Sequence, residues 1–282
     1  MSARLEEHRP PATDGSLVRT FIGSWFREVG GWMASAHVVQ LLGDAGLTTS
    51  SARTNLSRLK TKGLLAAEPR DGVPGYRLTR EAHPMLVRGD RRIYGHPQMT
   101  TKDPWLVVVF SVPEARRNLR HRLRSHLTWL GCGSVAPGVW IGPGHLLEET
   151  REVLAEVGLE RYTTLFCTTT PQVHGDLRDA VRQWWDLDAL SDLYTSFIEG
   201  HEAAARRSAD GELSDREAFV LHLRALDHWR SIPYLDPGLP AEYLPENWVG
   251  ERGLALFTRL HGALRAPSRR HVVAVTATPA TR

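Results

Sequence analysis

The chain has 282 residues, of which 41% are hydrophobic and 24% are charged. These values are ordinary for globular proteins, and the length allows two or three domains, each with its own core. The formal net charge of +3 is small, so a surface for an acidic partner must come from local clustering of basic residues. No segment approaches the roughly 20 uninterrupted apolar residues of a membrane helix. We therefore predict no membrane-spanning segment.

The two cysteines and the two ends of the chain point to a cytoplasmic protein. Cys132 and Cys167 are too few for a disulfide framework or a four-cysteine zinc site. We expect both to be buried small hydrophobic residues in a reducing compartment. The stretch 1–15 lacks the apolar core of a signal peptide and is predicted to be a disordered tail. The stretch 268–282 is likewise predicted to be a flexible tail.

The first ordered region, 16–92, predicts three helices followed by a β-hairpin. SLVRTFIGSWF and SAHVVQLLGDAG both space their apolar residues as helices do, and the second ends in a glycine turn. A third helix begins near Thr48 and would bury Ala52, Leu56 and Leu59. LLAAEPRDGVPGYRLT then predicts two short strands. This order is typical of a winged helix-turn-helix, whose turn and flanking helices dock in DNA.

The third helix carries an unbalanced charge. TTSSARTNLSRLKTKGLL, from 48 to 65, has four basic side chains and no acid, although mixed signs three or four residues apart would stabilise a solvated helix. A solvated face without a partner is one interpretation, and contact with DNA is the other. On DNA, arginines on the exposed side would bond guanine, while lysines and hairpin arginines would hold phosphates. The predicted contacts are Thr48, Thr49, Ser50, Arg53, Thr54, Ser57, Arg58, Lys60, Lys62, Arg70 and Arg77.

The middle region, 93–174, predicts the order βαββαβ of a ferredoxin-like domain. WLVVVFSV is a continuous apolar run, as in a central strand, and YTTLFCTT is the last strand. SVAPGVWI divides at a proline-glycine pair into two short strands. The helix EARRNLRHRLRSHLTWLG, residues 114–131, is rich in arginine. The sequence leaves open whether this helix touches DNA, a ligand or a second subunit.

The last ordered region, 175–267, is predicted to be a helical domain. Ser214 and Glu217 fit a capping box at the start of one helix. Trp184, Trp185 and Trp229 fall on predicted helices, where they would either pack in a core or line an apolar pocket for a small molecule. The predicted fold class is thus α+β, with a winged helix-turn-helix, a ferredoxin-like domain and a helical domain in that order.

Three sequence patterns resemble catalytic motifs but lack the context that the chemistry needs. Gly131, Gly133 and Ala136 fit a dinucleotide fingerprint, but they follow a helix and do not open one after a strand. His201-Glu202 begins like a zinc-protease helix, but the position four residues after the histidine is Ala205. Neither a nucleophile elbow nor a phosphate-binding loop occurs. We predict no enzymatic activity, no metal and no cofactor.

Nearly the whole chain, about 16–271, resembles the PaaX family of transcriptional repressors, which control phenylacetate and related aromatic catabolism. The resemblance is carried by five stretches: GGWMASAHVVQLLGDAGLTTSSARTNLSRLKTKGLL, RRIYG, WLVVVFSVPEARRNLRHRLRSHLTWLGCGSVAPGVWIGP, AFVLHLRALDHWRSIPYLDPGLPAEYLPENW and LALFTRLHGAL. In the third stretch, family members often have an aromatic residue where this chain has Cys132. The resemblance implies a winged-helix domain, a central domain similar to the CRISPR-associated Cas2 protein, and a helical C-terminal domain.

The resemblance also implies a homodimer that leaves its DNA operator when an acyl-CoA thioester, such as an aryl-acetyl-CoA, binds. The residues that we expect to contact this effector are Arg116, Arg120, Trp184, Trp185 and Trp229. Two other functions stay open. One is a Cas2-like, metal-dependent nuclease, although WLVVVFSV contains no carboxylate to hold a metal. The other is a DNA-binding regulator without any ligand.

Overall fold

The computed structural model describes residues 13–169 and 171–279. Its contacts divide the chain into two compact units. The first unit comprises Arg91–Tyr194 and Ser231–Gly250. The second comprises the described parts of Pro10–Asp90, Thr195–Arg230 and Glu251–Arg282. The region 175–267, predicted as one helical domain, therefore contributes residues to both units.

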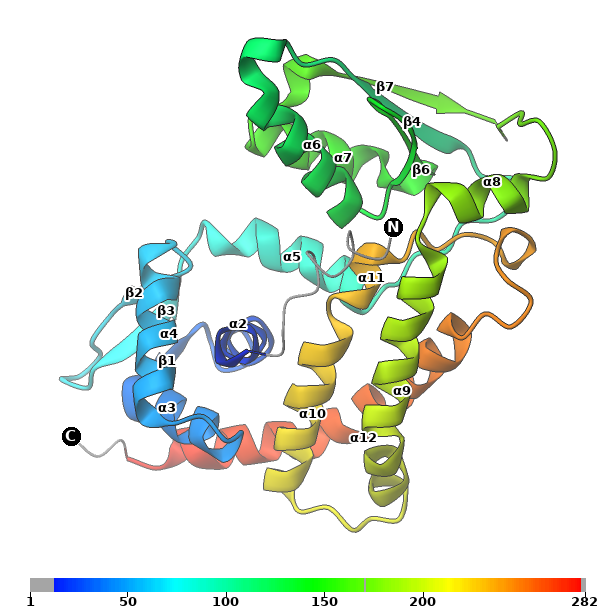
Figure 1. Ribbon diagram of the computed structural model, residues 1–282. Coiled ribbons are helices and arrows are strands. Elements are labelled where there is room, and N and C mark those ends of the chain that lie inside the picture. Colours follow the sequence, from blue (N-terminus) through cyan, green and yellow to red (C-terminus); the bar gives the residue numbers. More distant parts are fainter. Residues whose placement is uncertain (1–12, 170, 280–282) are drawn as a thin grey trace. The chain divides into compact units, whose positions relative to one another are not determined.

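The N-terminal part of the second unit begins with three helices and a small antiparallel sheet (Figure 1). The strands lie in the order β1-β3-β2, with Met33 opposite Tyr76 and Leu65 opposite Leu78. Asp71 and Gly72, at the tip of the hairpin, both have positive φ, as the two central residues of a type I′ turn require. The elements are α2 (Asp14–Trp25), β1 (Trp32–Ala34), α3 (Ser35–Asp44), α4 (Thr49–Thr61), β2 (Leu65–Ala67) and β3 (Gly75–Leu78).

Two features of this part were not predicted. Helix α2 begins at Asp14, with Thr13 as its N-cap, inside the predicted tail 1–15, whose residues 1–12 lie outside the described part. Helix α5 (Ala82–Ile93) follows the hairpin, where Pro84 and Gly89 obscure the helical period. The proline is the third residue of α5 and is tolerated there, because the first backbone N–H groups of a helix have no internal partner.

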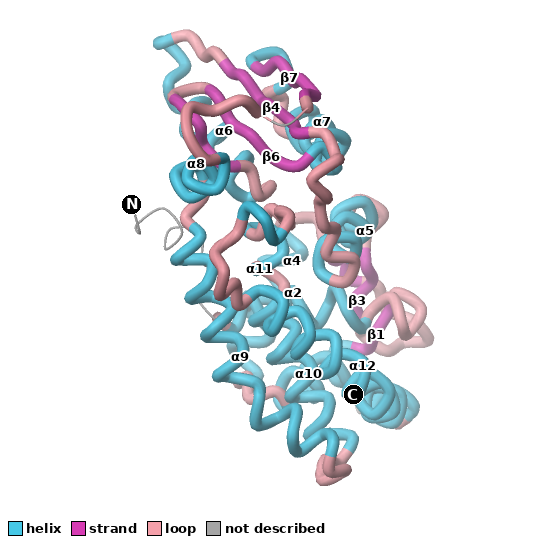
Figure 2. The backbone as a smooth tube through the Cα atoms, turned by 90° about the vertical axis from the view of Figure 1, so that its right-hand side faces the viewer, coloured by secondary structure: helices cyan, strands magenta, loops and turns pink. Residues whose placement is uncertain are grey.

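The C-terminal helices of the second unit share a core with the N-terminal ones. Figure 2 shows α9 (Leu187–Ala209) and α10 (Asp215–Trp229) side by side, and α10 contacts α2. Phe219 of α10 belongs to the same buried cluster as Phe21 and Trp25 of α2. Ser214 and Glu217 form the predicted capping box of α10.

The prediction of a flexible tail over 268–282 is wrong for the part that the structure describes. Helix α12 (Gly250–Ala277) runs through most of it. Val272 and Val275 are one turn apart on α12 and lie in the same buried cluster as the core residues of α2, α3 and α4. Burial of these valines in a cluster built mostly from the N-terminal helices holds the end of α12 in place.

The first unit contains a four-stranded antiparallel sheet in the order β5-β6-β4-β7. Leu106 and Val108 of β4 pack against Leu123 and Leu127 on the side covered by α6 and α7 (Figure 1). Trp105 packs toward the opposite side, against α8. The predicted order βαββαβ is present, as β4 (Trp105–Phe110), α6 (Arg117–Trp129), β5 (Gly133–Ala136), β6 (Val139–Pro143), α7 (Leu147–Glu156) and β7 (Thr163–Thr168).

Short elements complete the first unit. The helix predicted to run through both tryptophans is interrupted at Trp185, so that α8 (Leu177–Trp184) and α9 are separate. The remaining elements are α11 (Ile232–Leu235) and the single turns of 3₁₀ helix η1 (Glu114–Arg116), η2 (Gly144–Leu146), η3 (Glu160–Tyr162) and η4 (Ala241–Tyr243). No helix in the described residues is both long enough and apolar enough to cross a bilayer.

Candidate nucleic-acid interface and ligand cavities

Helix α4 separates an apolar face from a basic one. Thr48 caps the helix, since its side chain accepts a hydrogen bond from the backbone N–H of Ser51. Ala52, Leu56 and Leu59 are buried, as the sequence predicted. The burial of these residues fixes the rotation of the helix about its axis, and so fixes which side chains face outward.

The outward face carries the basic side chains. Neither Arg53, Lys60 nor Lys62 has an ion-pair partner among the described residues, and Arg58 only approaches the side-chain oxygen of Asn55 at 3.5 Å. The positive charges of these side chains are therefore not neutralised by acidic side chains of the described residues. All the predicted contacts of this segment are exposed, namely Thr48, Thr49, Ser50, Arg53, Thr54, Ser57, Arg58, Lys60 and Lys62.

The two arginines of the hairpin are held by one acid. Glu68 accepts hydrogen bonds from Arg70 at 2.9 Å and from Arg77 at 2.5 Å, and these bonds hold the pKa of Glu68 below its ordinary value. The Arg70 guanidinium also lies 5.1 Å from the ring centre of Trp32, whose Nε1 donates to the Glu68 carbonyl at 2.7 Å. Arg70 and Arg77 are thus oriented, but part of their charge is neutralised.

Acidic side chains connect the N-terminal helices to α10 and α12. Asp227 of α10 accepts hydrogen bonds from Ser16 at 2.7 Å, from Thr20 at 2.6 Å and from Arg230 at 3.1 Å. Asp44 pairs with Arg216 and His271, and Glu28 pairs with Arg265 and Arg269. These contacts could not be predicted from the sequence, because the partners are far apart in the chain.

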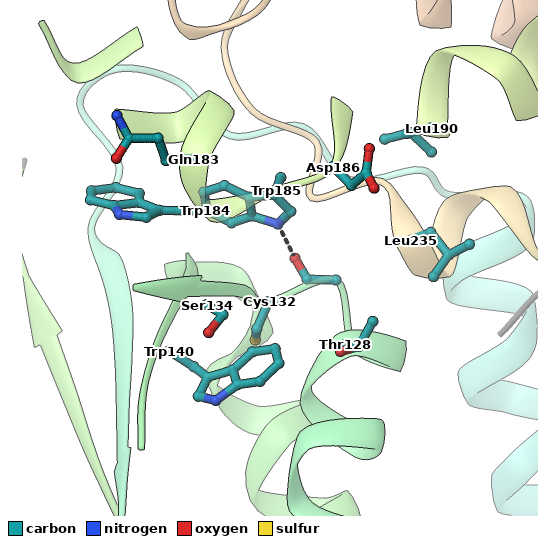
Figure 3. A pocket seen from close by; sticks show the side chains of 11 residues that line it. Thr128, Cys132, Ser134, Trp140, Gln183, Trp184, Trp185, Asp186, Leu190 and Leu235 are labelled. Atoms are coloured by element: carbon teal, nitrogen blue, oxygen red, sulfur yellow. Dashed lines mark hydrogen bonds between the residues drawn. The ribbon is translucent and has the colours of Figure 1, made fainter. Parts of the chain in front are cut away.

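A small cavity of about 100 Å³ in the first unit brings two of the predicted effector residues together. Trp184 and Trp185 line it, with Trp140 from β6 and Asp186 from the segment between α8 and α9 (Figure 3). A larger groove of about 460 Å³ lies next to it and shares Thr128, Ser134 and Trp140 with it. The larger groove is lined on the α6 side by His121 and Arg124, neither of which is among the predicted effector residues.

The other three residues of the predicted effector site lie elsewhere. Arg116 donates to the Tyr162 hydroxyl at 2.6 Å. Arg120 donates to the Val112 carbonyl at 2.8 Å and pairs with Glu114. Neither arginine lines the cavity or the groove.

Trp229 also lies outside the cavity. It is completely buried in the second unit, where its ring stacks on Phe257 at a centroid distance of 4.5 Å and lies 5.2 Å from the ring of Phe197. Its surroundings are those of a core residue.

The surroundings of the cysteines and of the buried histidines give no sign of a catalytic role. Burial raises the pKa of the Cys132 thiol to about 12, so this thiol is not a nucleophile. Cys167 is exposed, which corrects the expectation that both cysteines are buried. Burial lowers the pKa of His201 to about 4, and its Nε2 lies 3.2 Å from Nδ1 of His228. Within the described residues, no group of three or more His, Cys, Asp or Glu side chains could hold a metal ion.

Three models of one protein family match successive parts of the chain. Residues 13–82 match "PaaX-like protein", residues 98–181 match "PaaX protein central Cas2-like domain", and residues 185–274 match "PaaX-like protein C-terminal domain". The chain belongs to the PaaX family. Its β4–β7 sheet, with α6 and α7, is accordingly the Cas2-like domain of a PaaX-family protein.

Individual relatives agree with the family assignment. The transcriptional repressor PaaX of Escherichia coli (strain K12) is 24% identical over 255 residues, which are 89% of this chain and 80% of that protein. Among solved structures, the uncharacterized protein Rv0674 of Mycobacterium tuberculosis is similar with a TM-score of 0.60 and 22% identity. That match covers 93% of this chain and 98% of the other, and it shows a shared fold.

Proposed function

We propose that this PaaX-family chain is a DNA-binding transcriptional repressor, and that α2 to β3 form a winged helix-turn-helix with α4 as the recognition helix. One observation carries the proposal. The basic face of α4, with Arg53, Arg58, Lys60 and Lys62, is exposed, while its leucine face is buried. Similarity to a relative described as a transcriptional repressor supports the same conclusion.

The position of a basic side chain along α4 would decide whether it contacts a base edge or a phosphate. Arg53 and Arg58 project from the exposed side of the helix and would reach base edges, where an arginine bonds guanine O6 and N7 together. Lys60 and Lys62 at the end of the helix, with Arg70 and Arg77 of the hairpin, would contact phosphates. Such contacts release counterions, so the affinity for DNA should fall steeply with salt.

The protein would act as a cytoplasmic homodimer on a palindromic or nearly palindromic operator in a catabolic operon. In such a dimer, two copies of α4 enter successive major grooves, about 34–36 Å apart. An acyl-CoA effector of the phenylacetyl-CoA type would release the protein from DNA. To do so it must prefer a conformation in which this spacing is wrong, and common allosteric couplings amount to about 1–3 kcal/mol.

A nuclease is the alternative that the Cas2-like family match favours. Cleavage of a phosphodiester with Mg²⁺ needs carboxylates grouped around the metal. The strand β4 carries no acid, and Asp103, before this strand, accepts hydrogen bonds from Thr100. Incubation of the protein with labelled DNA and Mg²⁺ tests this alternative, and we expect the DNA to stay intact.

Gel shifts on the DNA upstream of the protein's own gene test the main proposal. We expect a shifted band that persists in an excess of unrelated competitor DNA at moderate salt. Equal competition by unrelated DNA would contradict a sequence-specific repressor. A thermal shift with acyl-CoA thioesters separates an effector-controlled regulator from one without a ligand, since an effector that binds the folded protein stabilises it.

Replacement of Glu68 by glutamine should strengthen DNA binding. The change removes a negative charge near the phosphates and frees Arg70 and Arg77, which Glu68 now neutralises in part. We expect about three- to tenfold higher affinity at low salt, and a salt slope steeper by about one. Glu202→Gln, the same change on an exposed acid of α9, serves as the control. Weaker binding by Glu68→Gln would mean that Glu68 orients the arginines more than it neutralises them.

A further inference from the structure

Helix α6 lies in a stretch of the chain that has only one sign of charge. No acidic residue occurs between Glu114 and Glu148, although opposite charges three or four residues apart would stabilise a solvated helix. Any negative charge that faces the basic side chains of α6 must therefore come from outside this helix. The same stretch contains five arginines, namely Arg116, Arg117, Arg120, Arg122 and Arg124.

Two of the five arginines are held by neighbouring residues of the first unit. Arg116 donates to the Tyr162 hydroxyl, and Arg120 pairs with Glu114. The other three are exposed and have no ion-pair partner among the described residues. They are Arg117, Arg122 and Arg124. The surface of α6 therefore keeps positive charge that the described part of the chain does not neutralise.

The neighbouring helix α7 does not supply this negative charge. It covers the same side of the sheet as α6 (Figure 1) and is rich in glutamate, but its first three glutamates each have a basic partner outside α6. The pairs are Glu148 with Arg151 at 3.3 Å, Glu149 with Arg92 at 2.9 Å and Glu152 with Arg91 at 3.8 Å.

The buried leucines of α6 fix which side chains face outward. Leu123 and Leu127 are buried in the core beside β4, so Arg117, His121 and Arg124, at intervals of four and three residues, share one exposed face. The groove of about 460 Å³ borders this face. Its other wall is the β5–β6 hairpin.

Polar groups and a fixed hairpin complete the groove. The hydroxyls of Ser125 and Thr128 line it beside Arg124, and such groups commonly bond phosphate oxygens. The turn of the hairpin is anchored to the end of β4, because the backbone N–H of Phe110 donates to the Gly138 carbonyl at 2.8 Å.

The arrangement of the arginines favours an extended anion. Arg117 and Arg124 are seven residues apart, which is about 10 Å along a helix, and only Arg124 lines the groove. A single phosphate would be held by cations that converge on one point, whereas each strand of duplex DNA carries one negative charge per about 3.4 Å of its axis. Charges spread along a helix face match the duplex better than a small ligand.

We propose that α6 and the β5–β6 hairpin form a second DNA-binding surface, which holds duplex DNA by its phosphates and without sequence preference. This inference rests on the proposed function, since the partner is the same. It assigns to the central domain a share of the affinity that is separate from the sequence-specific contacts of α4.

Fluorescence anisotropy on the full-length protein tests this surface, with the duplex that the protein prefers and an unrelated duplex of equal length as probes. Arg117→Gln, Arg122→Gln, Arg124→Gln should make the plot of log affinity against log salt concentration shallower by about two to three per subunit for both duplexes. The ratio of the two affinities should stay within about twofold, because phosphate contacts carry no sequence information.

Two further variants separate phosphate contacts from other effects. Arg206→Gln, Arg252→Gln, Arg259→Gln removes the same charge from exposed positions on α9 and α12 and should leave the salt slope unchanged. Lysine at positions 117, 122 and 124 should restore the salt slope, because a lysine holds a phosphate as a point charge. All the variants should keep the melting temperature of the unaltered protein, since the arginines replaced are exposed.

A salt slope of the α6 glutamine variant equal to that of the control would overturn the inference, while α4 would keep its proposed function. If that variant binds DNA normally but is no longer released by phenylacetyl-CoA, the surface belongs to the coenzyme phosphates and the inference is likewise wrong. A loss confined to the preferred duplex would mean that α6 reads bases, which contradicts binding without sequence preference. If the unaltered protein prefers neither duplex but the variant still lowers the slope, the sequence-specific function fails and the surface on α6 stands.

Discussion

Replacement of Asp227 by alanine should weaken the attachment of α2 to α10. The change removes the acceptor for Ser16 and Thr20 and leaves Arg230 without its acidic partner. The Asp227 side chain is only 8% exposed, and loss of one partner from a buried pair typically costs about 3–5 kcal/mol. Urea denaturation should therefore show a large drop in midpoint, and amides of α2 and α4 should exchange faster with solvent.

Asp215→Ala is a suitable control for the Asp227 variant. Asp215 pairs with Arg270 on the surface, where ion pairs contribute little, so the midpoint should hardly move. A midpoint for Asp227→Ala as high as that of this control would show that the hydrogen bonds around Asp227 do not hold α2 in place. Asp227→Asn, which keeps an acceptor oxygen, should fall between the two.

Replacement of Trp229 by alanine should produce a stability loss of similar size, without a specific effect on the effector. The side chain is completely buried against Phe257 and Phe197, and removal of such a residue costs about 3–5 kcal/mol. Denaturation measures the loss, and calorimetry on protein that remains folded at low temperature measures effector binding. Trp184→Ala should show the reverse pattern, because Trp184 is half-buried and lines the cavity. A stable Trp229→Ala variant that no longer binds the effector would restore Trp229 to the effector site.

Sequence patterns predicted those elements whose boundaries and buried faces depend on residues close together in the sequence. The period of Ala52, Leu56 and Leu59 gave the buried face of α4, and Ser214 with Glu217 gave a capping box. Such patterns depend on residues within one or two helical turns, which the sequence displays directly. The end of α12 could not be predicted in this way, because Val272 and Val275 are held by a core built from the other end of the chain.

In the candidate sites, too, contacts within one element were predictable and contacts between distant segments were not. Exposed positions on α4 follow from its helical period, so the outward direction of Arg53 and Arg58 was predictable. The partner of the hairpin arginines was not predicted, since pairing of Arg70 and Arg77 with Glu68 depends on the register of the hairpin. One cavity is lined by the adjacent residues Trp184, Trp185 and Asp186 together with Gly131 and Trp140. Only the fold shows that these two segments lie side by side. The sequence named all three tryptophans as candidates but gave no basis for separating Trp184 and Trp185, which line the cavity, from Trp229.

The affinity of an Arg53→Ala, Arg58→Ala variant for the DNA fragment that the protein prefers tests the central claim most directly. We predict a loss of at least about thirtyfold, because each arginine that bonds guanine contributes about 1–3 kcal/mol, with the circular dichroism spectrum unchanged. Arg252→Ala, Arg259→Ala removes the same charge from exposed positions on α12 and should leave the affinity within about twofold. Unchanged affinity of the α4 variant would contradict the assignment of α4 as the recognition helix.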